Sequence, residues 1–151
     1  MYYITKRFKN YPFAHRQHTH DGHCAWVHGH NWDFEICLES AALDENGFVF
    51  DFGKFKDFKD WLSQKFDHTC LINRDDPMLP VFRIMHDAGL MKLMEIDSCS
   101  SEGIARIVAE ELIEFLESMR GLDKRKINVV WVKVYEDEKN TAVYKPKQGD
   151  E

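Results

Sequence analysis

Histidine is the residue whose distribution first points to chemistry in this chain. Six of the eight histidines and one of the four cysteines lie between residues 15 and 30. A solvated loop has no structural use for so many imidazoles, whereas neutral imidazole is a common protein ligand for zinc and similar ions. The sequence therefore predicts a metal site in this segment.

The spacing of His28-Gly29-His30 is the most informative part of the segment. On a strand, side chains two residues apart point to the same face, so both rings can reach one ion. With His15 they would give three nitrogen ligands and an open fourth position, which is typical of catalytic zinc. We interpret the other histidines of the segment as exposed, because a tetrahedral ion needs few protein ligands. They are His18, His20 and His23.

Cys24 is the cysteine best placed for chemistry. It precedes His28 by four residues, and a cation nearby favours the thiolate form of a thiol. Cys24 is therefore a candidate base or nucleophile. Cys37 and Cys99 fit small buried hydrophobes better, and the role of Cys70 stays open.

Two further sites carry carboxylates. Asp67 precedes His68, and an acid beside an imidazole can orient a proton transfer, although such neighbours also occur by chance. Glu136 is in phase with Val130, Val132 and Val134, on the expected buried side of a strand. Acids are rarely buried unpaired, so Glu136 either meets a basic partner or accepts N–H groups from a ligand such as a guanine or pterin ring. The alternative is that it ends the strand in solvent.

Length and composition limit the classes of protein that could present these residues. At 151 residues, with 44% hydrophobic and 30% charged residues, the chain predicts one globular domain over residues 1–151. No apolar run approaches the roughly 20 residues that cross a bilayer, and the first residues do not resemble a signal peptide, so we expect a cytoplasmic protein. The net charge of −6 argues against a nucleic-acid partner. Four cysteines are too few for a disulfide scaffold.

The elements that must position these residues follow from hydrophobic periodicity. Period-two alternation predicts strands over residues 2–10 and 30–39, the first ended by Pro12, and a hairpin over 127–136 and 141–145. Helical spacing predicts one helix over 53–66, capped by Asp51, and another from Ser100 or Ser101 to Gly121.

The remaining segments carry weaker signals. Residues 67–73 are predicted to be irregular, 74–98 to hold one or two short helical turns, and 146–151 to be disordered. The order β, β, α, α, β, β favours an α+β fold in which two helices cover one face of a four-stranded antiparallel sheet.

Five segments together resemble the 6-pyruvoyl-tetrahydropterin synthase family, and they occur in the family's order over most of the chain. They are Phe13-Ala14-His15-Arg16, Cys24 with three residues before His28-Gly29-His30, Asp51-Phe52, Asp67-His68, and Val132-Lys133-Val134-Tyr135-Glu136. The resemblance implies the tunnelling fold, in which the sheets of several subunits join into a barrel with helices outside. It also implies a homohexamer made of two trimers, with active sites between subunits.

The resemblance further implies a role for each candidate residue. His15, His28 and His30 bind zinc; Cys24 is the catalytic base; Asp67 and His68 complete the proton relay; and Glu136 anchors the pterin. The implied substrate is 7,8-dihydroneopterin triphosphate. The three-residue gap between Cys24 and His28 resembles the branch that makes 6-carboxy-5,6,7,8-tetrahydropterin, acetaldehyde and triphosphate in queuosine biosynthesis.

The chain departs from the family pattern in three places. The family's Pro-Thr-x-Glu reads Cys99-Ser100-Ser101-Glu102 here, which keeps a hydroxyl and the acid Glu102 for ring contacts but loses the proline. The segment 74–97 is longer than expected, and the loop from His15 to Cys24 is slightly short. The triphosphate contacts stay open, with Arg16 and several lysines as candidates.

Alternative functions also stay open. They are a 6-pyruvoyl product from the same substrate, another zinc enzyme such as a small hydrolase, and a non-catalytic zinc- or pterin-binding paralogue.

Overall fold

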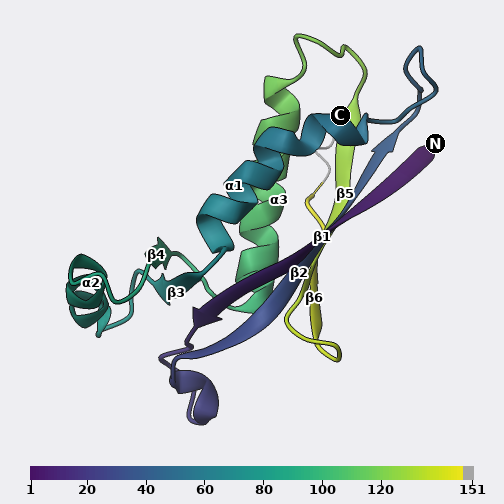
Figure 1. Cartoon of the computed structure of the whole chain (residues 1–151). Helices are drawn as coiled ribbons and strands as arrows, with labels where there is room; N and C mark the ends of the chain where they lie inside the picture. Colours follow the sequence, from purple (N-terminus) through teal and green to yellow (C-terminus); the bar gives the residue numbers. More distant parts are fainter. Residues whose placement is uncertain (148–151) are drawn as a thin grey trace.

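Two long strands form the centre of the molecule. The computed structural model describes residues 1–147, and in it β1 (Tyr2–His15) pairs antiparallel with β2 (His28–Ser40). β5 (Ile127–Tyr135) pairs with the other side of β2, and β6 (Thr141–Tyr144) pairs with β5. These four strands confirm the predicted antiparallel part of the sheet, and they twist strongly across one another (Figure 1).

The sheet has six strands, however, so the prediction of a four-stranded antiparallel sheet was wrong. β3 (Thr69–Asn73) and β4 (Leu93–Ile96) extend it beyond β1 with parallel pairing, in the order β4-β3-β1-β2-β5-β6. Every residue of β3 is buried, so the segment lacks the alternation by which a half-exposed strand is recognised. β4 has four residues, too few to show a period.

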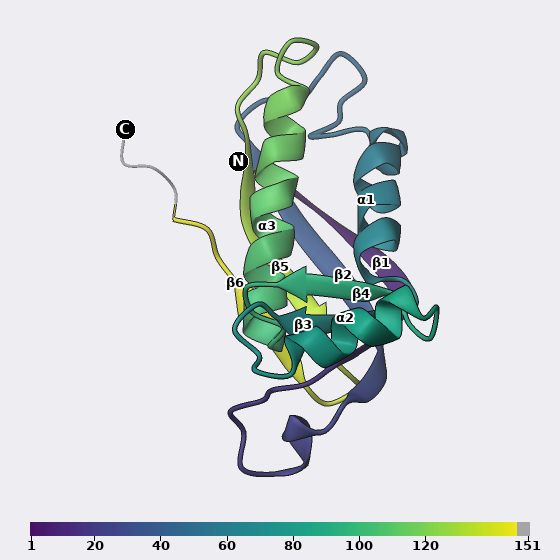
Figure 2. The same ribbon diagram turned by 90° about the vertical axis from the view of Figure 1, so that its left-hand side faces the viewer.

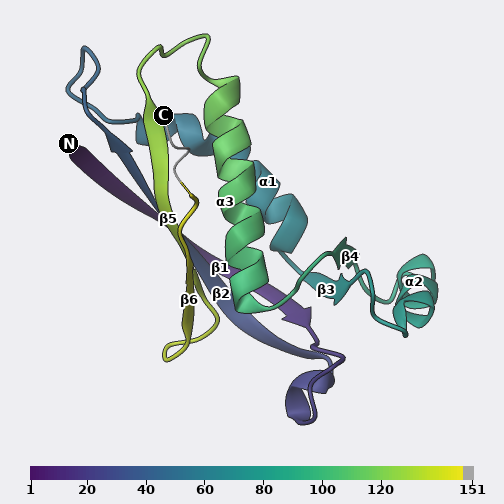
Figure 3. The same cartoon turned by 180° about the vertical axis from the view of Figure 1, so that it is seen from behind.

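Three α-helices are present in the described part of the chain: the two predicted helices, and a third in the segment 74–98, where only one or two short helical turns were predicted. α1 (Lys56–Phe66) and α3 (Ser101–Ser118) lie side by side on one face of the sheet, as Figure 2 shows. The short 3-10 helix η2 (Phe52–Phe55) leads into α1. α2 (Leu79–Asp87) stands apart from them, joining β3 to β4 at the edge of the sheet (Figure 3).

The predicted helix starts are confirmed by their caps. The Asp51 carboxylate accepts a hydrogen bond from Gly53 N at the start of η2, and the Ser100 hydroxyl accepts one from Gly103 N at the start of α3. Such caps satisfy backbone donors that have no partner inside the helix and are worth about 1 kcal/mol each.

The core lies between the sheet and the two covering helices. The alternating residues of β2 fill it as predicted, with side chains at most 1% exposed: Trp32, Phe34, Ile36 and Leu38. They pack against apolar residues of α1 and α3 in one cluster. Burying a large apolar side chain is worth about 2 kcal/mol, so this apolar face fixes the position and direction of β2 against the helices.

β1 continues five residues beyond the predicted end, through Pro12 to His15. The register shifts between Phe8 and Tyr11, where Asn10 has a left-handed φ of 69°. Pro12 is tolerated because its carbonyl faces away from β2 and accepts from His68 N at 2.8 Å, so no hydrogen bond to β2 requires a proline N–H. The longer strand carries His15 to the start of β2.

Two further predictions concern the end of the chain and the absence of a membrane-spanning segment. Residues 148–151 of the tail predicted to be disordered lie outside the described residues. Over the described part of the chain, none of the helices combines the length and the apolar character needed to span a bilayer.

Candidate metal centre

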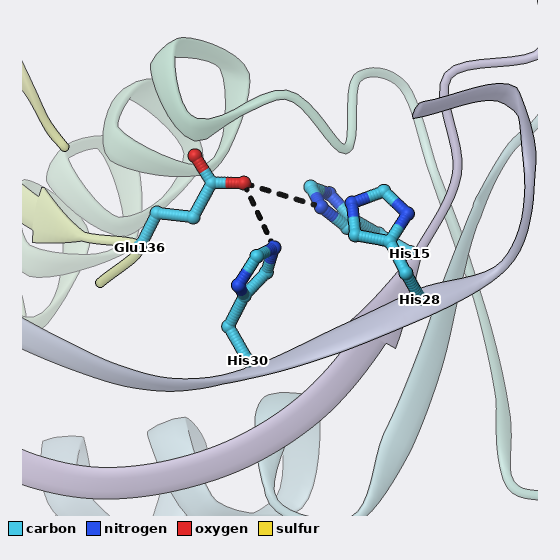
Figure 4. Close-up of side chains that lie close together, drawn as sticks. All are labelled: His15, His28, His30 and Glu136. Atoms are coloured by element: carbon cyan, nitrogen blue, oxygen red, sulfur yellow. Dashed lines mark ion pairs between the residues drawn. The ribbon is translucent and has the colours of Figure 1, made fainter. Parts of the chain in front are cut away.

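The register of β1 and β2 brings three predicted ligands together. His15, the last residue of β1, lies directly opposite His28, the first residue of β2, and His30 follows on the same face. The carboxylate of Glu136, just after β5, completes the group. Ligand atoms of all four residues lie within 4.8 Å of one another, and the side chains converge (Figure 4).

Backbone carbonyls fix the orientation of two of the rings. Nδ1 of His15 lies 2.7 Å from the Cys99 carbonyl, and Nδ1 of His28 lies 2.7 Å from the Trp26 carbonyl. A carbonyl only accepts hydrogen bonds, so Nδ1 carries the proton in each ring and Nε2 keeps its lone pair. Metal-binding histidines are usually supported in this way.

The chemistry of the group fits a divalent ion. Among the described residues, Nε2 of His15 and Nε2 of His30 are buried without a hydrogen-bond partner, which is costly unless a ligand satisfies them. Burial lowers the pKa of His15, and the neighbouring rings of His28 and His30 lower it further, so the neutral ligand form is favoured. Three imidazole nitrogens, with or without a carboxylate oxygen, suit tetrahedral zinc.

Glu136 reaches the centre because its side chain has the phase predicted from Val132 and Val134. The predicted phase of Val130 was wrong, because the register shifts there and Val129 is buried instead. Its Oε1 lies 3.0 Å from Nε2 of His30 and 3.6 Å from Nε2 of His15, although not in hydrogen-bond geometry to either. The Ser101 hydroxyl donates to its Oε2 at 3.4 Å. The carboxylate is thus neither buried alone nor left in solvent, and it can serve as a fourth ligand or accept from a bound molecule.

Two cavities flank Glu136. One, of about 420 Å³, is lined by Cys24, His28, His30 and Glu136 among others. Cys24 lies in the 3-10 turn η1 (His23–Ala25). The other cavity, of about 400 Å³, is more polar and is lined by Glu102 as well as Glu136. Cys24 and Glu102 therefore line different cavities that share Glu136.

Asp67 and His68 do not line either of these cavities. The Asp67 carboxylate accepts from Nδ1 of His68 at 2.8 Å, so the predicted pair exists, but the His68 side chain is 81% exposed. The backbone N–H of His68 donates to the Pro12 carbonyl. Pro12 precedes His15 by three residues, which corresponds to about 10 Å along a strand. Within one chain, the pair is separate from the metal centre.

One prediction about the histidine loop was wrong, and one candidate residue of this loop has a partner within the chain. His18 is only 11% exposed, because it lies against Asp75 and Asp76, whereas His20 and His23 are exposed as predicted. Arg16 was a candidate phosphate ligand, but its guanidinium is bound to the buried Asp76 carboxylate. Asp76 lies 60 residues along the chain, so no local pattern could have identified this ion pair.

The other three cysteines are buried, as predicted for two of them. They are Cys37, Cys70 and Cys99. Burial raises the pKa of the Cys70 and Cys99 thiols to about 11 and also raises the pKa of Cys37. Of the four cysteines, only Cys24 is accessible enough to react with solutes in the folded chain.

Comparison with known proteins gives consistent matches over most of the chain. The sequence model of a family described as 6-pyruvoyl tetrahydropterin synthase matches residues 3–147. A protein of Aquifex aeolicus named 6-carboxy-5,6,7,8-tetrahydropterin synthase is 30% identical over 124 residues, 81% of this chain and 75% of that protein.

A second relative and one solved structure are also similar to the chain. A Rickettsia conorii protein with the same name is 36% identical over 73 residues, which span 48% of this chain and about half, 52%, of that protein. The crystal structure of an uncharacterized protein from Wolinella succinogenes superposes with a TM-score of 0.81 at 22% identity, covering 97% of this chain and 98% of the other. This likeness shows a shared fold.

Proposed function

The chain belongs to the 6-pyruvoyl tetrahydropterin synthase family, and on this premise we propose that it is a zinc-dependent lyase acting on 7,8-dihydroneopterin triphosphate. The observation that carries the proposal is the convergence of three imidazoles beside Cys24 and Glu136. The names of the Aquifex and Rickettsia relatives favour 6-carboxy-5,6,7,8-tetrahydropterin as the product, and hence a role in queuosine biosynthesis.

The proposed reaction balances with one water. 7,8-Dihydroneopterin triphosphate and water would give 6-carboxy-5,6,7,8-tetrahydropterin, acetaldehyde and triphosphate. The triphosphate leaves with its bridging oxygen, and the carbon–carbon bond of the side chain breaks in a step like a retro-aldol cleavage. No external oxidant or reductant is needed, because reduction of the ring is matched by oxidation of the side-chain carbon that becomes the carboxylate.

His15, His28 and His30 would hold the zinc, which when bound would polarise a side-chain hydroxyl or carbonyl as a Lewis acid. The Cys24 thiolate, facing the same cavity, would remove a proton from the substrate side chain. Glu136 and Glu102 border the more polar cavity and would accept N–H groups from the edge of the pterin ring. The ring and the side chain would thus occupy the two cavities that Glu136 borders.

A second copy of the chain would supply Asp67 and His68. The pair is exposed and separate from its own metal centre, so it is free to face the centre of a neighbour. There the imidazole, oriented by the Asp67 carboxylate, would return a proton to the intermediate. This arrangement requires an oligomer, and we propose a homohexamer made of two trimers.

The sheet offers edges through which copies could associate. β1 pairs with β3 only at residues 13–15, so over residues 2–8 its outer edge meets no strand of the described chain, and β6 pairs only with β5. Unpaired edges favour strand addition by another chain. The helix-free face carries polar pairs, Arg7 with Asp33 and Tyr135 with Glu35, so it is poorly suited to stacking on a second sheet.

Product identification tests the proposal. The zinc-loaded protein is incubated with 7,8-dihydroneopterin triphosphate, and the products are identified by mass spectrometry. 6-Carboxy-5,6,7,8-tetrahydropterin with acetaldehyde is the expected result. A 6-pyruvoyl product would place the chain in the other branch, and unconsumed substrate that still binds would indicate a non-catalytic paralogue.

Two variants test the roles of the residues in this reaction. We expect Cys24→Ala to keep zinc and lose turnover, whereas wild-type turnover would remove Cys24 from the mechanism. Glu136→Gln is expected to weaken pterin binding, because an amide accepts N–H groups less strongly than a carboxylate. Unchanged affinity would argue against the anchoring role.

A further inference from the structure

A buried ion pair lies beside the metal centre without contributing a ligand to it. Arg16 follows His15 in the chain, and its Nε and Nη2 donate to the Asp76 carboxylate at 2.6 and 2.8 Å. The Asp76 side chain is fully buried and the Arg16 side chain is 18% exposed. Asp76 belongs to the connection between β3 and α2, where its Oδ1 also accepts from Met78 N at 2.8 Å.

The third donor of Arg16 reaches the turn that carries Cys24. Nη1 of Arg16 donates to the Ala25 carbonyl at 3.3 Å, and Gln17 N donates to the Cys24 carbonyl at 2.8 Å. Gly22, which precedes the turn, provides no side-chain cap. Contacts from residues 16 and 17 therefore hold the short turn at the cavity wall.

Stability alone is a weak reason for this ion pair. Taking two charges out of water costs free energy, and apolar replacements of buried ion pairs are often neutral or stabilising. What apolar side chains cannot do is bind three oxygen acceptors in one plane, as a guanidinium does. The arrangement uses this property, because two acceptors are on Asp76 and the third is next to Cys24.

We propose that Arg16 and Asp76 are positioning residues for Cys24. Asp76 orients the Arg16 guanidinium, Arg16 holds the Ala25 carbonyl, and the Cys24 thiol is thereby fixed beside His28 and His30. The catalytic value of this placement rests on the proposed function. The restraint on the turn does not, and it can be measured without a substrate.

The accessibility of the thiols provides the measurement. Zinc-loaded wild type and Asp76→Asn are treated with iodoacetamide over a range of pH, and the alkylation rate of each cysteine is followed by mass spectrometry. The pH range separates a change in access from a change in ionisation. We expect the plateau rate at Cys24 to rise about fivefold in Asp76→Asn, because loss of the restraint increases the open population of the turn.

Two controls separate release of the turn from a general loss of stability. Cys99 contacts the Arg16 carbonyl, so the buried Cys37 and Cys70 report unfolding within the same molecule, and their rates should remain far below the Cys24 rate. Asp123→Asn removes the carboxylate of a comparable pair, in which Arg125 also donates to backbone carbonyls, and this pair is not among the residues that line the metal-centre cavities. This variant should change the Cys24 rate less than about twofold.

A folded Asp76→Asn protein with the wild-type Cys24 rate would overturn the proposal. If this variant unfolds, so that all four cysteines react, Arg16→Lys decides. The introduced ammonium can pair with Asp76 but cannot also reach the Ala25 carbonyl. A selective rise in the alkylation rate of Cys24 therefore supports the proposal, and an unchanged rate overturns it. Failure to turn over a pterin would count against the proposed function only, since alkylation needs no substrate.

Discussion

At the scale of single residues, the support of each imidazole matters as much as its presence. The His15 ring is 4% exposed and donates to the Cys99 carbonyl, while Cys99 N donates to Oδ1 of Asn73 at 2.8 Å. Asn73, the last residue of β3, therefore supports the metal centre through one peptide group. In other metal sites, loss of a hydrogen bond that supports a ligand commonly lowers the affinity for the metal by about 10- to 100-fold.

We expect Asn73→Ala to weaken zinc binding about tenfold, because the Cys99 carbonyl would lose its fixed position. The dissociation constant is measured by competition with a chromophoric chelator. His20→Ala serves as a control, since His20 is exposed and outside the group of ligands. Equal affinities in Asn73→Ala and wild type would show that the Cys99 carbonyl needs no support from Asn73.

Asp76 should also link stability to pH. Burial alone would raise the pKa of its carboxyl, but hydrogen bonds from Arg16 and from Met78 N outweigh burial and lower it. A carboxyl whose pKa is lower in the folded than in the unfolded state stabilises the folded state at pH values above its unfolded pKa of about 3.9. This stabilisation is lost as the pH falls through the pKa of the folded state.

Asp76→Asn should therefore reduce the free energy of unfolding at pH 7, and the difference from wild type should shrink progressively below about pH 4. Urea unfolding of both proteins at a series of pH values measures this difference. A difference that is constant down to the lowest accessible pH would mean that the ionisation of Asp76 is not coupled to folding.

At the scale of elements, periodicity predicted the strands and helices that have one exposed face and one buried face. β2 and α3 each present a polar face, so their alternation or helical spacing was visible in the sequence. β3 is buried throughout and β4 is very short, so the same rules gave an irregular segment. Their partners are set by packing against β1, which no local pattern encodes.

The start of α3 gives a sharper test of how elements pack. A Cβ added at Gly103 would lie 2.7 Å from the backbone oxygen of Ser98 and 2.4 Å from its Cβ. Alanine normally favours a helix over glycine by about 1 kcal/mol, yet at this position the clash should dominate.

We expect Gly103→Ala to lower the free energy of unfolding by about 2 kcal/mol, as overpacking does in cores. It should also weaken zinc binding, because Ser98 adjoins Cys99. Gly121→Ala, where an added Cβ meets nothing within 4 Å, should change the free energy of unfolding by less than about 1 kcal/mol. Urea denaturation compares the variants, and a stabilised Gly103→Ala protein would contradict the prediction.

At the scale of the whole molecule, the candidate site was predictable in part. The sequence predicted His15, His28 and His30 as one group and placed Glu136 on the buried side of its strand, but that Glu136 joins the histidines emerged only from the structure. The Arg16–Asp76 pair and the support from Cys99 were not predictable, because they join segments 60 and 84 residues apart through contacts without a motif. Asp67 and His68 lie away from the metal centre within one chain, and the proposal assigns them to the centre of a second copy.

The outer edge of β6 allows a test of assembly. Glu136 N donates to the Asn140 carbonyl, so Ala142 and Tyr144 face β5 in the following hydrogen-bonded pairs and the N–H of Val143 points outward. Val143→Pro would remove this outward donor without breaking the pairing of β5 with β6.

We expect Val143→Pro to reduce the proposed homohexamer to single chains of 17.9 kDa, as measured by light scattering after gel filtration. Turnover should be lost while zinc is retained, because the centre lies within one chain and Asp67 and His68 would come from another. Val143→Ala keeps the N–H and should assemble normally. A Val143→Pro protein with wild-type mass would exclude this edge as an interface.

The distribution of the four converging side chains along the chain has a consequence for the order of folding. His15, His28 and His30 lie within sixteen residues, on a hairpin whose closure costs little chain entropy, whereas Glu136 follows more than a hundred residues later. An ion present during synthesis or refolding could therefore meet three ligands as soon as β1 and β2 pair. The metal would then act as a template for the first hairpin, before β5 brings the carboxylate into place.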